Sequence, residues 1–234
     1  MFDEDTSVLI DQGVVTFSAG LATLTLTVPT NPVGSELAEK STASIRSVLQ
    51  ARQVLTRRSF ELNGPNITHH RDDGRRDIVI VAGTGEFKIS GFAPDIRITA
   101  ADGTVVRDTR AERLAHHRAF VQRLASKAAG SPTVRRILES FSQSVADPDN
   151  ELVHLYEIRD AAGAHFGTDA AARNALGISS RDWSALGRLA NDDPLKQGRH
   201  RGKQIDGLRD ATYEELDQAR TIARNILEAF VEVI

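Results

Sequence analysis

The chain contains no cysteine among its 234 residues. This absence excludes disulfide bonds, thiolate catalysis and cysteine-based zinc sites, and it suits a protein of the cytoplasm. No apolar run approaches the roughly 18 residues of a membrane span, so we expect no association with a membrane. The first residues are acidic, unlike the basic start of a secretory signal.

The chain also lacks a surplus of positive charge, and its formal net charge is −3. Residues 1–108 carry 11 Lys and Arg against 14 Asp and Glu, and residues 109–234 carry 18 of each kind. A bulk electrostatic attraction to phosphates is therefore excluded. Any nucleic-acid binding has to come from a local basic patch.

Residues 1–108 show the two-residue periodicity of β-strands. From Leu21 to Val28 apolar residues alternate with threonine, which predicts a strand with one buried face and one Thr-lined face toward solvent. Val14–Phe17 precedes this strand across a Ser-Ala-Gly turn, so the two segments are expected to form a hairpin. Further strands are predicted over residues 78–81, 86–90, 96–99 and 104–107. A helix packed on the sheet is predicted by apolar residues at helical spacing: Leu37, Ile45, Val48, Leu49 and Leu55.

Residues 109–234 show helical periodicity and clear signals for helix starts. A helix over 111–127 is followed by Ser131-Pro132, an N-cap with proline in the first turn. Further helices are predicted to start at Asp147-Pro148, Thr168, Ser179 and Thr212, the last with a Thr212-x-x-Glu215 capping box. The sequence therefore predicts an α+β protein, with a β-rich domain over 1–108 and a helical bundle over 109–234.

The densest positive charge lies between two of these predicted helices. Residues 196–203 read Lys-Gln-Gly-Arg-His-Arg-Gly-Lys and hold four fixed positive charges. Such a cluster is costly to bury, so we expect it at the surface, where it is the best candidate for a phosphate or nucleic-acid contact. The residues predicted to bind nucleic acid are Lys196, Arg199, Arg201, Lys203 and Arg181.

Arg181 belongs to a second candidate, a helix-turn-helix over residues 171–186. In DNA-binding versions of this motif, the first residues of the second helix enter the major groove, here Ser180, Arg181 and Ser184. The alternative is a corner that only packs two helices, which many helical bundles contain. In either case Trp183 and Leu186 are expected to face inward.

From about residue 147 the chain resembles the HEPN superfamily, helical proteins common in bacterial defence and toxin systems. The resemblance rests on the Leu152–Tyr156 spacing, on an Asn followed by Arg199-His200-x-Gly, and on the long amphipathic last helix. Active members cleave RNA with an Arg and a His four to six residues apart, usually as homodimers. The resemblance implies His200 as the acid–base group. Arg199, directly before it, or Arg188, twelve positions before it, would stabilise the phosphate charge.

Three functions therefore stand as hypotheses. The first is an interaction protein that contacts RNA or DNA through the basic loop, with a homodimer through its helical part and a protein partner for its β-rich domain. The second is a metal-independent RNase of the HEPN type, and the third is a protein–protein interaction module without a nucleic-acid role. For the loop itself, the alternative is a solvated segment that caps neighbouring helix ends. No cofactor is expected.

Two histidine pairs raise the question of a metal. His69-His70 lies in a stretch, residues 63–76, that is expected to be an exposed loop, and neighbouring side chains of an extended segment point opposite ways. His116 and His117 lie about 100° apart on a predicted helix. We therefore expect neither pair to hold a metal.

Overall fold

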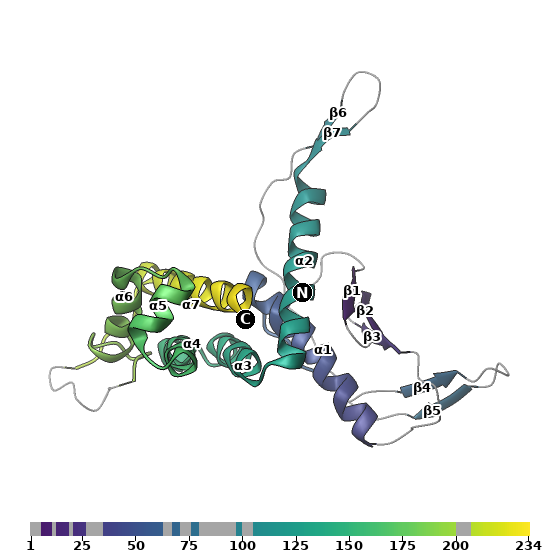
Figure 1. The fold of residues 1–234 in the computed structure, drawn as a ribbon, viewed down its shortest axis with the longest axis horizontal. Helices are drawn as coiled ribbons and strands as arrows, with labels where there is room; N and C mark the ends of the chain where they lie inside the picture. Colours follow the sequence, from purple (N-terminus) through teal and green to yellow (C-terminus); the bar gives the residue numbers. More distant parts are fainter. Residues whose placement is uncertain are drawn as a thin grey trace. The chain divides into compact units, whose positions relative to one another are not determined.

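The structure is a computed structural model of the chain. It describes residues 6–10, 13–18, 21–26, 35–62, 67–70, 76–79, 97–99, 105–199 and 207–234. The predicted α+β class is confirmed, because small antiparallel sheets are followed by a helical C-terminal part (Figure 1). The chain divides into two units, residues 1–126 and 127–234. This division falls within α2 (Thr109–Gly130), the helix at whose first residue the sequence places the start of the second domain.

The first sheet contains β1 (Thr6–Ile10), β2 (Gly13–Ser18) and β3 (Leu21–Thr25), in the order β1-β2-β3. The predicted hairpin is confirmed, with Ser18 opposite Leu21. On one face Val8 and Val15 are buried, whereas Thr23 and Thr25 on the other are exposed, as their alternation predicted. β1 was not predicted.

Two further strand pairs follow: β4 (Ile67–His70) with β5 (Arg76–Val79), and β6 (Arg97–Thr99) with β7 (Val105–Asp108). The prediction of a loop over 63–76 is wrong for β4. There the β-branched Ile67 and Thr68 pair with Val79 and Ile78. The strand predicted over 86–90 lies outside the described residues. The predicted helix is present as α1 (Ser35–Thr56), and it contacts β3.

The helical unit contains α3 (Pro132–Ala146), the short 3-10 helix η1 (Pro148–Asn150), α4 (Glu151–Phe166), α5 (Asp169–Leu176), α6 (Ser180–Asn191) and α7 (Tyr213–Val233). The helix starts follow the predicted caps. The hydroxyls of Ser131, Thr168 and Ser179 each accept a hydrogen bond from a first-turn N–H, and Thr212 and Glu215 form the reciprocal capping box.

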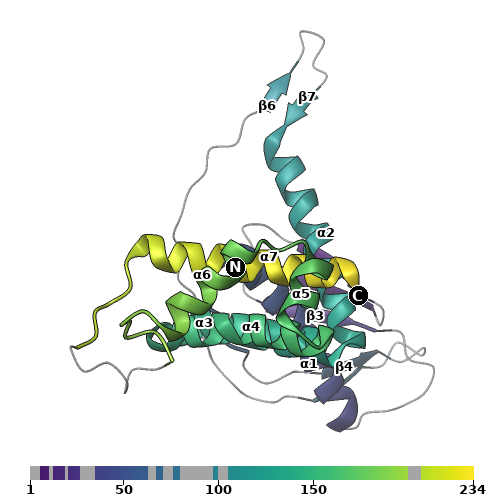
Figure 2. The same cartoon turned by 60° about the vertical axis from the view of Figure 1, so that its left-hand side comes forward.

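α4 is the central helix of this unit, because it packs against α3, α5, α6 and α7 (Figure 2). Its apolar residues Leu152, Leu155 and Ile158 are fully buried. An ion pair joins its first turn to α7. Arg220 Nε and Nη2 donate to the two carboxylate oxygens of Glu151 at 2.7 and 2.8 Å. Among the helices that the structure describes, none is long and apolar enough to cross a membrane.

Candidate functional site

Two short stretches flank residues 200–206, and backbone hydrogen bonds hold them side by side. Leu195 and Arg209 form a parallel β-bridge. The Lys196 N–H donates to the Arg209 carbonyl, and the Arg209 N–H donates to the Pro194 carbonyl, both at 3.0 Å. We call residues 194–199 and 207–211 the loop base. Since Leu195 is fully buried, this base is anchored in the helical unit.

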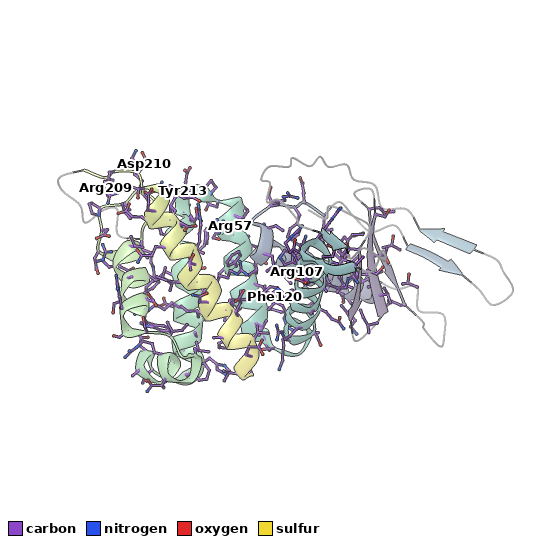
Figure 3. All side chains as sticks on the ribbon, turned by 90° about the horizontal axis from the view of Figure 1, so that it is seen from above. Arg57, Arg107, Phe120, Arg209, Asp210 and Tyr213 are labelled. Atoms are coloured by element: carbon purple, nitrogen blue, oxygen red, sulfur yellow. The ribbon has the colours of Figure 1, made fainter. Side chains whose placement is uncertain are left out.

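Side chains reinforce the loop base and join it to the start of α7. Arg209 makes a bidentate ion pair with Glu215, at 2.7 and 2.6 Å. The Arg209 guanidinium, together with the Thr212 backbone N–H, lowers the pKa of Glu215 to about 2. The Lys196 ammonium lies 2.9 Å from Asp210 and lowers the pKa of that carboxyl. Arg209, Asp210 and Tyr213 lie close together in Figure 3.

The predicted cations that the structure describes differ in their surroundings. Lys196 pairs with Asp210 across the loop base, whereas Arg188 on α6 pairs with Asp193, directly before the base. Arg181, at the start of α6, is exposed and makes no ion pair within the described part of the chain. His200, Arg201 and Lys203 lie outside the described residues.

Arg199 has a different environment from the other cations. Its backbone N–H donates to the Ala190 carbonyl at 2.7 Å, in the last turn of α6. Its guanidinium lies over the Tyr156 ring, 4.9 Å from the centroid, and Nη1 donates to Asp160 at 3.1 Å. The Arg199 side chain is still 38% exposed. Arg199 is thus held by α4 and α6 while part of its guanidinium remains open to solvent.

A second arginine lies behind Tyr156. The Arg159 guanidinium is 5.0 Å from the centroid of Tyr156 and 5.1 Å from that of Trp183, and Nη2 donates to Asp169 at 2.7 Å. The Arg159 side chain is only 14% exposed. It fits there because residue 187 is glycine, where a Cβ would clash with Arg159 Nη1. Tyr156, Arg159, Trp183 and Arg199 together form what we call the stacked cluster.

The acid at the edge of the stacked cluster is Asp169, the first residue of α5. Its pKa lies below the usual value because the Trp183 indole N–H and the Arg159 guanidinium both stabilise the carboxylate. The indole contact is looser than an ordinary hydrogen bond, whereas the Arg159 bond is short. Asp169 therefore fixes the orientation of Arg159.

Sequence reasoning missed Arg159 and Asp160 as members of the candidate site. Tyr156, Arg159 and Asp160 are spaced i, i+3 and i+4 on α4, so the pattern places them on one helix face. The sequence indicated a role for Tyr156 only as part of the Leu152–Tyr156 spacing on which the HEPN resemblance rests. Their link to Arg199 is tertiary, because 39 positions separate Asp160 from Arg199.

The helix-turn-helix candidate corresponds to α5, the left-handed Gly177 with φ 64°, and α6. Trp183 and Leu186 are buried, as predicted. Both helices pack against α4 and α7, so the corner contributes to the bundle core. This arrangement accounts for the motif by packing alone. Groove reading by Arg181 stays a prediction.

The second histidine pair lies on α2. The rings of His116 and His117 are 6.3 Å apart, and His117 Nδ1 lies 3.0 Å from Arg52 Nη1. Within the ranges that the structure describes, no three His, Asp or Glu side chains gather as metal ligands.

Comparisons with protein-family models, curated proteins and solved structures found no match to this chain.

Proposed function

We propose that the helical unit contacts the phosphates of a nucleic acid through Arg199 and the basic residues that follow it. The observation that carries this proposal is that the Arg199 side chain is both held in place and partly exposed. Two helices fix its position, yet its guanidinium is partly open to solvent. It is also the point where the chain enters the segment that contains His200, Arg201 and Lys203.

The ion pair with Asp160 does not prevent phosphate binding by Arg199. Asp160 is 51% exposed and Arg199 is 38% exposed, so water screens the pair. Exposed pairs of this kind contribute roughly 0.2–1 kcal/mol. A phosphate can therefore replace the carboxylate at small cost. It can also use guanidinium N–H groups that Asp160 leaves open, since arginine carries five.

The loop base supports the same proposal by fixing both ends of the basic segment. Acids in or beside the loop base already neutralise three cations, since Lys196 pairs with Asp210, Arg188 with Asp193 and Arg209 with Glu215. Arg181 makes no ion pair within the described part of the chain, and water screens the pair between Arg199 and Asp160, so both can attract a ligand. Together with Arg201 and Lys203 of the basic segment, these cations are expected to contribute most to binding.

The test is a binding titration with labelled single-stranded RNA and duplex DNA over a series of salt concentrations. We expect affinity to fall with salt, by a log–log slope of roughly 0.7 per neutralised phosphate for a single strand. Arg199→Ala and the double variant Arg201→Ala/Lys203→Ala are expected to weaken binding and reduce the slope. Arg224→Ala is the matched control, because Arg224 is also partly exposed and ion-paired but lies within α7. Salt-independent binding, or equal losses in the control, would contradict the proposal.

The same samples distinguish the RNase from a binding protein. Cleavage of RNA in the presence of a chelator, lost in His200→Ala, would assign the HEPN-type reaction to this loop. Binding without cleavage would leave a nucleic-acid-contacting interaction protein. Absence of both would leave the protein–protein module. HEPN membership, the homodimer, a role in defence and a cytoplasmic location stay predictions.

A further inference from the structure

The geometry of Arg199 offers more than a positive charge. A guanidinium is planar, and that of Arg199 lies over the Tyr156 ring with its centre 4.9 Å from the ring centroid. Asp160 accepts a hydrogen bond from Nη1, which lies at the edge of the plane. The exposed part of the guanidinium is thus left beside an aromatic ring whose position is fixed.

The support beneath Arg199 is rigid. Tyr156 is half-buried, with its ring near Gly187 on α6 and in contact with the Arg159 guanidinium. Arg159 is held in turn by Trp183, which is 3% exposed, and by the bond to Asp169. The stacked cluster therefore joins α4, α6 and the loop base, and the bond from Arg159 to Asp169 links it to α5. Such support limits the entropy that Arg199 loses when it binds a ligand.

We infer that Arg199, backed by Tyr156, stacks on an unpaired nucleobase, and that the ligand of this site is therefore a single-stranded nucleic acid. This inference rests on the proposed function and names its ligand class. Unpaired bases stack on arginine planes and aromatic rings, whereas the bases of a duplex have their faces covered by neighbouring bases.

Asp160 is compatible with a base at this position. A nucleobase is neutral, so it does not need to displace the carboxylate from Arg199. The Asp160 hydrogen bond can remain and hold the guanidinium plane while the base covers its open face. A phosphate, by contrast, competes with Asp160 for N–H donors or binds beside a negative charge. Asp160 thus leaves the exposed part of the guanidinium to a base, while a phosphate can still use the remaining N–H groups at its edge.

The experiment compares oligouridylate with an abasic ribose-phosphate oligomer of the same length, which has the phosphates but no bases. Wild-type protein is expected to bind oligouridylate about 5- to 150-fold more tightly, the range for stacking one base. Arg199→Lys keeps the charge but lacks the planar group. It is expected to bind the abasic oligomer like wild type and to lose most of the preference for bases. Tyr156→Phe is expected to retain the preference, and Tyr156→Leu to reduce it.

The outcomes separate this inference from the proposed function. Equal wild-type affinity for both oligomers would overturn base stacking and leave phosphate binding in place. The same holds if Arg199→Lys retains the full preference. Binding to neither oligomer would overturn both proposals. Because Tyr156→Leu can disturb the fold, Arg199→Lys, a substitution at a partly exposed side chain, decides the question.

Discussion

Replacing Gly187 by alanine tests the stacked cluster, because the expected effect on the free energy of unfolding is opposite in sign to the usual effect of this substitution in a helix. Gly187 lies inside α6, and alanine at an interior helix position ordinarily stabilises a protein by about 1 kcal/mol relative to glycine. Here the new methyl group would meet Arg159 Nη1. Because that atom is the tip of a side chain, the guanidinium swings away and the backbone stays in place. The cost is therefore the set of contacts that Arg159 loses.

The structure gives the size of that cost. Arg159 contacts two aromatic rings, each worth about 0.5–2 kcal/mol. Its ion pair with Asp169 adds no more than about 1 kcal/mol, because Asp169 is 57% exposed. These contacts sum to about 1–5 kcal/mol, centred near 3 kcal/mol, against a helical gain of about 1 kcal/mol. Gly187→Ala is therefore expected to lower the free energy of unfolding by about 2 kcal/mol.

The assay is urea unfolding followed by tryptophan fluorescence and by circular dichroism. Trp183 is the only tryptophan and is buried in the helical unit, so its fluorescence reports on that unit. The control is the same substitution in an Arg159→Ala background, where the methyl group has room and should stabilise by about 1 kcal/mol. If Gly187→Ala stabilises both backgrounds equally, Arg159 does not occupy the space over Gly187 and the stacked cluster is wrong.

Two further predictions concern ion pairs of the helical unit. Arg220→Ala removes the cation that pairs with the buried Glu151 and should lower the free energy of unfolding, measured in urea, by about 2–4 kcal/mol. This loss lies at the lower end for buried ion pairs because Arg220 is 24% exposed. Adding Glu151→Gln should recover part of that loss, because a neutral amide is cheaper to bury, and no recovery would argue against a charge effect. Glu215 has a pKa lowered to about 2 by Arg209, so its stabilising effect is complete above about pH 5 and is lost as the pH falls toward 2. Glu215→Gln should therefore be less stable than wild type at pH 7, and the two should converge near pH 2; parallel pH profiles would refute the assignment.

The helix starts could be predicted because caps act over three residues. Ser131, Thr168, Ser179 and Thr212 each satisfy a first-turn N–H that their own sequence neighbourhood supplies. The Thr-lined face of β3 followed in the same way from two-residue alternation. β4 was missed because Gly64 and Pro65 before it and two histidines within it indicated a loop. A strand so short is specified by its pairing with β5 as much as by its own residues.

The candidate site could be predicted only in part. The density of charge over 196–203 is visible in the sequence, but the acids that neutralise it are not. Asp160 comes from α4, and Asp210 from beyond the loop. Gly187 resembles any helical glycine until Arg159 is seen against it. Such pairings depend on how α4, α6 and the loop base pack, and no local spacing rule encodes them.

The loop base has a consequence for the seven residues that its two stretches enclose in the sequence. The seven residues 200–206 join two stretches that the parallel bridge between Leu195 and Arg209 and the Lys196–Asp210 ion pair already hold together. Closing the loop therefore places little demand on the sequence between them. A change of sequence at these seven positions is therefore expected to alter what the chain binds before it alters the stability of the helical unit.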